Sequence, residues 1–360
     1  MPEQVPIAFV RSGRGWLGEG PVVRGHFAAG DAYREAAAWW SRVVAERRGA
    51  GREDPIVAFG SFSFDASSPA GATLLVPERV RRVERGMPRL GALPLPAATV
   101  HDGIMSHAAY EEAVDRVRAA IAAGRLEKSV LARDVVVEPA GPVDLGSLLD
   151  ALASAHPDAA VFCVDGLVGA SPETLVTVHD GIATARVLAG TAGPGEAEAL
   201  AGSDKDRHEH ELAARSVTEA LAPHVVRLEA TEPYVLELPH LTHLATDVRA
   251  EISDGSDVLA LVAALHPTAA VAGTPVGAAL DWIHEVEPVD RGRYSGPVGW
   301  VDANGDGEWA IALRCAQLRA DGTFQAFAGA GIMADSVPEL ELAETELKLR
   351  PILEALGAVR

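Results

Sequence analysis

Residues 160–188 read AVFCVDGLVGASPETLVTVHDGIATARVL, and this stretch decides the class of fold. Two dipeptides within it, Asp165-Gly166 and Asp180-Gly181, supply the residues that two-residue hairpin turns favour. Apolar, strand-like runs surround these turns, as expected for antiparallel strands. The runs are 160–164, 174–178 and 182–188. The stretch therefore predicts consecutive hairpins.

Outward from these hairpins, helical patterns appear on both sides. Ser106 can cap a helix whose apolar residues recur at helical spacing until Gly124 ends it. Further helices are predicted over residues 203–224, 258–265 and 337–356, and further strands over 128–137, 236–252, 296–301, 309–318 and 323–328. Helices and hairpins alternate without a βαβ rhythm, so the sequence predicts an α+β fold. Residues 1–103, rich in Gly and Pro, are expected to form an irregular, β-containing part of that fold.

The composition excludes several classes of function. Lys and Arg total 31 against 51 Asp and Glu, so the formal net charge is -20, which disfavours binding to nucleic acid or anionic membranes. The N-terminus lacks the regions of a signal peptide, and the most apolar stretch, 258–280, is broken by Pro and Gly. We therefore expect no membrane span. Cys163 and Cys315 cannot form a disulfide framework, and reduced thiols in a cytoplasm are expected.

Several short motifs do not carry the chemistry that they suggest. Gly13–Gly18 matches a dinucleotide fingerprint, but no helix follows to face a pyrophosphate. Asp302–Gly307 matches half of a calcium loop, but Leu313 stands where the bidentate Glu belongs, so we interpret it as a polar hairpin turn. The histidine pairs lack zinc-like partners. They are His208 with His210 and His240 with His243.

Acidic residues occupy apolar positions in two predicted helices. The apolar stripe of the helix after Ser203 extends backward onto Glu209, and an inward carboxylate needs a cation, a buried partner or a raised pKa. In the last helix, Glu341, Glu344 and Lys348 share one stripe. A solvated Glu344–Lys348 ion pair is one interpretation. Carboxylates that converge on a hard ion such as Mg²⁺ are the other, and both stay open.

Two charged residues in the strand region are candidates for acid–base chemistry. Lys128 opens an otherwise apolar strand, and a partly buried lysine suits a general base. Glu173 lies at the entrance of another strand. The alternatives are a solubilising charge at a strand end for Lys128 and a turn residue for Glu173, because most charged residues are exposed.

Taken as a set, nine ordered segments resemble the chorismate-utilising enzymes, and among them the isochorismate synthases. They are EKSVLAR (127–133), ASPETL (170–175), LAGTAGPG (188–195), KDRHEHEL (205–212), LPHLTHLAT (238–246), LHPTAAVAGTP (265–275), DRGRYSGPVGW (290–300), GDGEWAIALRCAQL (305–318) and AGAGIMADSVPELELAETELK (328–348). The resemblance implies a chorismate-binding fold, with large antiparallel sheets packed face to face and helices outside. It implies that residues 104–358 form the catalytic region.

The resemblance also implies residue roles. Lys128 would activate water for attack on C2 of chorismate, and Glu173 would protonate the leaving C4 hydroxyl. Glu209 and Glu344 would bind Mg²⁺, with Glu341 nearby. The remaining implied contacts are to substrate: Arg314 and Lys348 to the enolpyruvyl carboxylate, the backbones of Gly190, Thr191, Gly329 and Gly331, and His243, Ala270 and Tyr294.

Within the family, three positions favour water as the nucleophile and isochorismate as the product. Ala189 stands where aminodeoxychorismate synthases carry a nucleophilic lysine, and anthranilate synthases lack the base at position 128. No glutaminase subunit is therefore expected. Salicylate synthases, which share Lys and Glu but tend to carry Thr at the position of Ala270, are the runner-up.

Two hypotheses from other classes stay open. One is a catalytically inactive chorismate-binding subunit, and the other is an acidic metal-binding protein. Isochorismate feeds menaquinone, catechol siderophores and salicylate, and the sequence does not choose among these pathways.

Overall fold

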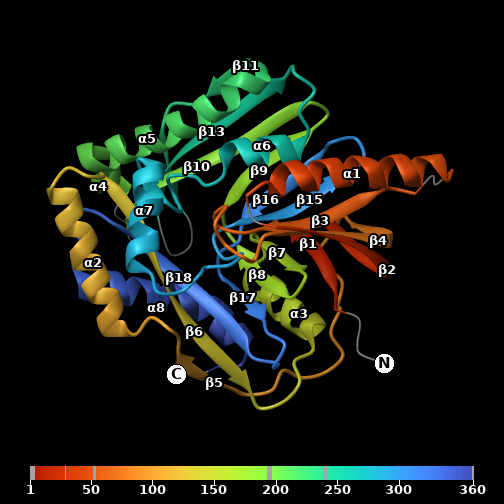
Figure 1. The fold of residues 1–360 in the computed structure, drawn as a ribbon, viewed down its shortest axis with the longest axis horizontal. Coiled ribbons are helices and arrows are strands. Elements are labelled where there is room, and N and C mark those ends of the chain that lie inside the picture. The colour runs from red at the N-terminus through yellow and green to blue at the C-terminus, as the bar shows by residue number, and fades with distance from the viewer. Residues whose placement is uncertain (1–4, 29, 52–53, 193–196, 238–241, 359–360) are drawn as a thin grey trace.

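The computed structural model describes residues 5–28, 30–51, 54–192, 197–237 and 242–358 (Figure 1). Within its helices and strands, six side chains lie outside that description: Thr191, Ala192, Ala199, Lys205, Glu209 and Glu237. The helices are α1 (Ala32–Gly49), α2 (His107–Ala122), α3 (Leu145–Ala155), α4 (Ala197–Gly202), α5 (Asp204–Leu221), α6 (Val258–Leu265), α7 (Val276–Val286) and α8 (Pro338–Ala355), with a 3₁₀ turn η1 (Ala222–His224).

The strands alternate with these helices along the chain. They are β1 (Ile7–Arg11), β2 (Arg14–Phe27), β3 (Val57–Phe62), β4 (Ala72–Val83), β5 (Ala98–Asp102), β6 (Lys128–Pro139), β7 (Ala160–Val164), β8 (Leu167–Ser171), β9 (Thr174–His179), β10 (Ile182–Ala192), β11 (Val225–Ala230), β12 (Tyr234–Glu237), β13 (Thr242–Ile252), β14 (Gly273–Thr274), β15 (Pro297–Asp302), β16 (Gly307–Ile311), β17 (Cys315–Leu318) and β18 (Phe324–Ile332).

Among the described residues, every pair of these strands is antiparallel, and the pairings connect all of them. β6 has β18 along one edge, from Ser129 opposite Ile332 to Val137 opposite Phe324. Its other edge is shared by β14, which pairs at the start of β6, and β5, which pairs at its end. Between these two short partners, part of the second edge of β6 has no strand beside it within the described part of the chain.

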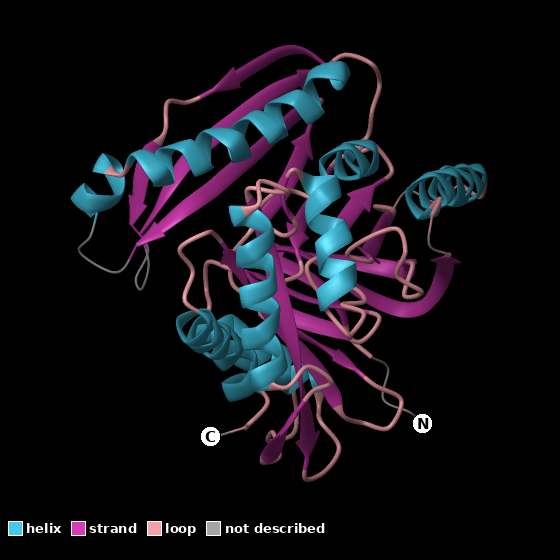
Figure 2. Cartoon of the chain, turned by 60° about the vertical axis from the view of Figure 1, so that its left-hand side comes forward, coloured by secondary structure: helices cyan, strands magenta, loops and turns pink. Residues whose placement is uncertain are grey.

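The two faces of the sheet bury different clusters of side chains. Phe9, Phe59 and Phe162 belong to a cluster built almost entirely from strand residues, where layers of the sheet pack face to face. Ala8 and Val10, which flank Phe9 in β1, point to the opposite face and pack with α3 and α8. A third cluster joins the sheet to α1, α2, α6 and α7. Figure 2 shows the helices on the outside of the strands, as expected for this fold.

The strongest local patterns predicted their elements well. α2 is capped by Ser106, whose Oγ accepts a hydrogen bond from the Ala109 N–H, and α6 matches the predicted range. Both hairpin turns adopt positive φ, with Asp165 at 51° and Asp180 at 49°. The prediction placed no strand at β8, although this strand follows directly from the first turn.

Four helices were not predicted, namely α1, α3, α4 and α7. The N-terminal part is therefore more regular than its Gly and Pro content indicates, since it contains the 18-residue α1 and the 14-residue β2. α1 buries only a narrow stripe, Ala32, Ala36, Trp40 and Val43, on strands β2 and β4 and on α6. Among the described residues, no helix combines the length and the apolar character that crossing a lipid bilayer would require.

Candidate active site

Lys128 begins β6 at the point where this strand has a partner on each edge. It pairs with Thr274 of β14, and the next residue, Ser129, pairs with Ile332 of β18. Its half-buried side chain passes over Gly331, where an added Cβ would lie 2.9 Å from Lys128 Cε and 3.5 Å from Nζ. Glycine at position 331 therefore leaves the space that the lysine side chain occupies.

Glu173 lies in the turn between β8 and β9. The Ser171 Oγ accepts a hydrogen bond of 3.2 Å from its N–H, and its carbonyl accepts one of 3.1 Å from the Ile311 N–H. Burial raises the pKa of the Glu173 carboxyl to about 7, although the charges of Lys128 and Lys348 act to lower it. A carboxyl group with a pKa near neutrality can donate a proton at working pH.

A small cavity of about 30 Å³ adjoins Glu173. Its lining includes Thr268, Ala269 and Ala270 from the segment after α6, together with residues of β10 and α5. The Thr268 Oγ1 is buried and has no hydrogen-bond partner among the described residues. A cavity of this size with polar groups in its wall can hold one water molecule.

Helix α8, which lies beside β18, carries the predicted stripe of Glu341, Glu344 and Lys348 (Figure 1). The Lys348 Nζ lies 2.5 Å from the Glu344 Oε1 and donates a 2.9 Å hydrogen bond to the Gly329 carbonyl. Because Lys348 also acts on Glu173, the stripe faces the same region as Lys128. The Glu344–Lys348 ion pair, which the sequence offered as the alternative to a metal site, is thus present. Lys348 also donates a hydrogen bond to β18.

Arg314 and His243 are two further ionisable residues of the predicted site. Arg314, between β16 and β17, has a φ of 50°, and burial lowers its pKa while Tyr294 and Glu344 act to raise it. For His243, on β13, burial lowers the pKa, a hydrogen bond to the Gly190 backbone acts to raise it, and Lys348 lowers it further.

The carboxylates of α8 fit a hard cation. Burial raises the pKa of Glu341, a hydrogen bond from Ser336 acts to lower it, and the negative charge of Glu344 raises it. The ammonium group of Lys348 contacts Glu344, and its positive charge reduces the repulsion between the two carboxylates. Oxygen donors of this type suit Mg²⁺. Glu209 lies on α5, and its side chain is outside the described part of the chain.

The other predicted residues occupy varied environments. Gly190 has a φ of 72° beside a bulge in β10, which favours glycine, and Thr191 pairs with His243. The side chain of Thr191 is outside the description. Tyr294 is buried and stacks on Phe327, with ring centroids 5.3 Å apart, and burial raises its pKa to about 12.

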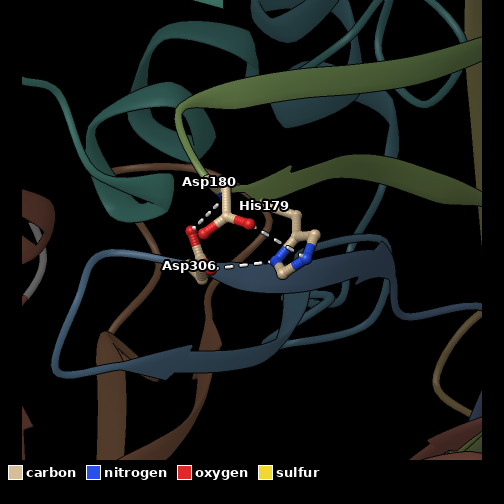
Figure 3. A group of neighbouring side chains, drawn as sticks. All are labelled: His179, Asp180 and Asp306. Atoms are coloured by element: carbon tan, nitrogen blue, oxygen red, sulfur yellow. Dashed lines mark hydrogen bonds and ion pairs between the residues drawn. The ribbon is translucent and has the colours of Figure 1, made fainter.

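Another group has metal-compatible geometry but lies elsewhere. The side chains of His179, Asp180 and Asp306 each offer a ligand atom, all within 4.8 Å of one another (Figure 3). They already bond among themselves: the His179 Nδ1 lies 3.0 Å from the Asp306 Oδ2, and the Asp180 N–H donates to Asp306 Oδ1 at 2.9 Å. The group is mostly exposed and sits at the end of β9 opposite Glu173, about 20 Å away at 3.3 Å per residue. The Asp302–Gly307 segment forms the predicted turn, with the Asp302 Oδ1 accepting from two backbone N–H groups.

Three residues next to the site were not singled out from the sequence. Glu287 and Arg291 form an ion pair behind β6, with each side chain only 2% exposed. Tyr110 of α2 is buried between α8 and β6, and its hydroxyl lies 3.4 Å from the Leu131 carbonyl. An acid four residues before an arginine resembles a solvated surface pair, so no local signal marked Glu287 and Arg291 as buried.

This fold and this cluster of groups fit the class of chorismate-binding enzymes. Residues 88–357 match the family model described as chorismate binding enzyme, and the chain belongs to that family. It is 33% identical over 334 residues to the isochorismate synthase EntC of Escherichia coli, covering 88% of this chain and 84% of that protein.

Two further comparisons agree. The salicylate biosynthesis isochorismate synthase of Pseudomonas aeruginosa is 41% identical over 263 residues, which is 69% of this chain but only 55% of that longer protein. The crystal structure of DhbC from Bacillus anthracis superimposes with a TM-score of 0.84 at 34% identity, covering 97% of this chain and 95% of that one.

Proposed function

We propose that this protein isomerises chorismate to isochorismate. The neutral amine form of Lys128 takes a proton from water as the water oxygen bonds to C2, the ring double bonds shift, and the C4–O bond breaks as Glu173 protonates the departing hydroxyl. One water molecule enters and one leaves, so the reaction is a net isomerisation. The names of the relatives from Escherichia coli and Pseudomonas aeruginosa support this assignment.

The convergence of Lys128 and Glu173 is the observation that carries the proposal. Lys128 begins β6 and Glu173 lies in the turn between β8 and β9, and a positive charge on Lys128 acts to lower the pKa of the Glu173 carboxyl, which burial has raised to about 7. At neutral pH such a carboxyl is protonated in a large fraction of molecules, as a general acid must be. The adjoining cavity gives the departing water a place to move into.

Substrate binding follows from the charges around this pair. Arg314 can hold a carboxylate through two parallel N–H donors, and Lys348 can add a third. In our proposal Glu344, Glu341 and Glu209 would hold Mg²⁺, and the ion would supply positive charge to balance the second carboxylate of chorismate. The three acids therefore favour a dianionic substrate only when the cation is bound.

The test is a product assay on the intact chain. Incubation with chorismate and Mg²⁺ is expected to yield isochorismate without pyruvate, and formation of pyruvate with salicylate would assign the alternative lyase activity. Lys128→Ala and Glu173→Gln are each expected to lose at least about 100-fold in turnover. Glu308→Gln is the matched control, because burial also raises the pKa of Glu308 but its partner is Arg11, on β1.

The proposal also covers location and partners. We place the enzyme in the cytoplasm, acting without a glutaminase subunit, because water and not ammonia is the nucleophile. The buried free thiols of Cys163 and Cys315 are compatible with a reducing compartment. Ammonia-dependent formation of an aminated product from chorismate would contradict the choice of nucleophile.

A further inference from the structure

The ion pair between Glu287 and Arg291 is buried against the strand that carries Lys128. The Arg291 Nε lies 2.8 Å from Glu287 Oε2 and the second guanidinium nitrogen, Nη2, lies 2.5 Å from Oε1, so the contact is a bidentate fork. Glu287 ends α7 as its C-terminal cap residue. The guanidinium carbon of Arg291 stands 4.2 Å from the centre of the Phe64 ring, which closes the pair from another side.

Both members of the pair also bond the backbone of β6. The Arg291 Nη2 donates to the Val130 carbonyl at 2.6 Å, and Glu287 Oε1 accepts from the Ala132 N–H at 2.8 Å. Residues 130 and 132 present these groups to the same edge of β6, because successive residues of a strand alternate. This is the edge that β14 leaves open after pairing with Lys128 and Ser129. The two side chains thus supply a donor and an acceptor where a neighbouring strand would.

The same arginine reaches the segment that leads into β14. Its Nη1 donates to the Val271 carbonyl at 3.1 Å, and the Val130 N–H donates to the Ala272 carbonyl at 2.9 Å. Val271 follows Ala270, which lines the cavity beside Glu173. Arg291 therefore joins the strand of the proposed base to the segment that borders the proposed acid.

A buried ion pair is a costly way to fill this space. Apolar residues of similar volume often serve a fold as well or better, because two charges must leave water. Apolar residues cannot, however, satisfy the Val130 carbonyl and the Ala132 N–H, which would stay unpaired at an edge with no strand. The geometry of the pair thus meets a requirement of this one strand.

We propose that Glu287 and Arg291 are positioning residues that fix the start of β6 and the 271–274 segment in one arrangement, and so set the place of Lys128 relative to Glu173. This inference rests on the proposed function of those two residues. A misplacement of about 1 Å between reacting groups can cost about 100-fold in rate, so small movements of β6 matter. The pair acts through the backbone of β6, so its loss is expected to act on turnover more than on substrate affinity.

The experiment compares Arg291→Lys with the double variant Glu287→Met/Arg291→Met in the full chain. The double variant removes both charges together, so no buried charge is left unpaired. We expect kcat to fall at least about 30-fold while KM for chorismate stays within about threefold. Arg291→Lys keeps one donor for the Val130 carbonyl but loses the fork, and its kcat is expected to lie between those of the double variant and the wild type.

The matched control is Arg11→Met/Glu308→Met. That pair is also largely buried, with side chains 19% and 17% exposed and a 2.5 Å contact, but it joins β1 to β16 and bonds no residue of β6. Its kcat is expected to stay within about twofold of the wild type. Equal losses of kcat in both double variants would overturn the inference, since they would indicate a general cost of losing buried charge.

Amide hydrogen exchange gives a second measurement that does not depend on turnover. Ala132 N–H is expected to exchange faster in the Glu287→Met/Arg291→Met variant and unchanged in the Arg11/Glu308 control. Unchanged exchange at Ala132, or a folded double variant with full kcat, would overturn the inference. A wild-type chain that makes no isochorismate would instead reject the proposed function, and the exchange result would still decide whether the pair fixes β6. If the double variant does not fold, Arg291→Lys carries the same comparison.

Discussion

The ammonium group of Lys348 lies 2.5 Å from the carboxylate of Glu344 and also donates to the Gly329 carbonyl, so one lysine joins α8 to β18 at the site. The Glu344 side chain is 48% exposed, and solvent weakens the attraction between the two charges. The contact therefore adds little stability. Its position, with Lys348 acting on both Glu173 and His243, indicates a role in binding charge.

Lys348→Met separates these two roles. An exposed i, i+4 pair contributes about 0.3–0.5 kcal/mol and the hydrogen bond to the Gly329 carbonyl about 0.5–1.5 kcal/mol, so the melting temperature is expected to fall by no more than about 5 °C. Loss of a cation that grips a substrate carboxylate is expected to raise KM for chorismate at least about tenfold. Calorimetric melting together with steady-state kinetics measures both. A KM equal to that of the wild type would indicate that Glu344 and Lys348 form an ordinary surface ion pair with no role in substrate binding.

Gly331→Ala tests whether the sheet leaves space for Lys128. The added Cβ would lie 2.9 Å from Lys128 Cε, so the lysine must move. We expect kcat to fall about 10- to 100-fold in a protein that remains folded. Gly277→Ala is the control, because an added Cβ there meets nothing within 4 Å, and alanine in α7 is expected to be neutral or slightly stabilising. Full activity of Gly331→Ala would show that the lysine does not need this path.

The pKa of Glu173 predicts how activity depends on pH. Since burial raises this pKa to about 7, the carboxyl is protonated below that pH, and kcat is expected to fall as the pH rises through about 7. In Lys128→Met the cation that lowers the pKa is gone, so the pKa of Glu173 is expected to rise. Carbon NMR of labelled glutamate measures this shift. A Glu173 that titrates near pH 4.5 in both proteins would exclude it as the acid.

The free energy of unfolding is also expected to depend on the ionisation of the Glu173 carboxyl. The pKa of Glu173 is higher in the folded than in the unfolded chain, so folding favours its protonated form. The stabilising contribution is fully present below the unfolded pKa and is lost as the pH rises through about 7. Glu173→Gln, which cannot ionise, is expected to flatten this dependence in denaturant titrations at pH 5 and pH 8. An unchanged dependence would show that the carboxyl is already ionised in the folded protein.

Removal of Mg²⁺ tests how a chain of net charge -20 binds a dianion. In chelator, the carboxylates of Glu341 and Glu344 are expected to repel chorismate, and its affinity, measured by calorimetry, should fall steeply. Glu344→Gln removes one of these charges, so its affinity in chelator is expected to exceed that of the wild type. If the affinity for chorismate were the same with and without chelator, Mg²⁺ would not be what offsets the negative charge of the site.

Sequence patterns were sufficient to single out residues that depart from ordinary patterning. Lys128 opens an apolar strand, and Glu341 and Glu344 interrupt an apolar stripe, so these residues stood out before any fold was known. The resemblance of the ordered segments to a known family then suggested a role for each of these residues, and those roles stay predictions. The hairpin turns were equally visible because Asp165 and Asp180 adopt a positive φ that few residue types accept.

Relationships between distant segments were not predictable in this way. Gly331 matters because β18 lies beside β6, and Glu287 and Arg291 matter because β14 is too short to cover the edge of β6. Neither fact has a local signature. α7 was missed because its short sequence follows Gly273 and Pro275, which indicate a turn, while packing on β6 and β14 makes it a helix.

Arg314 gives the last prediction, because its backbone and its charge both oppose stability. A non-glycine residue with a φ of 50° costs roughly 1–2 kcal/mol, and burial lowers the pKa of its guanidinium, which means that the folded state disfavours the charge. Strain of this kind persists where a function requires it. Arg314→Gly removes both costs, so the melting temperature is expected to stay level or rise, while KM for chorismate rises at least about tenfold. Arg314→Lys keeps the backbone strain and one positive charge. Its KM for chorismate is expected to lie between those of the wild type and Arg314→Gly, with no gain in stability. Destabilisation of Arg314→Gly by more than about 2 kcal/mol, measured by denaturant unfolding, would show that Arg314 stabilises the fold and is not held in place for the substrate.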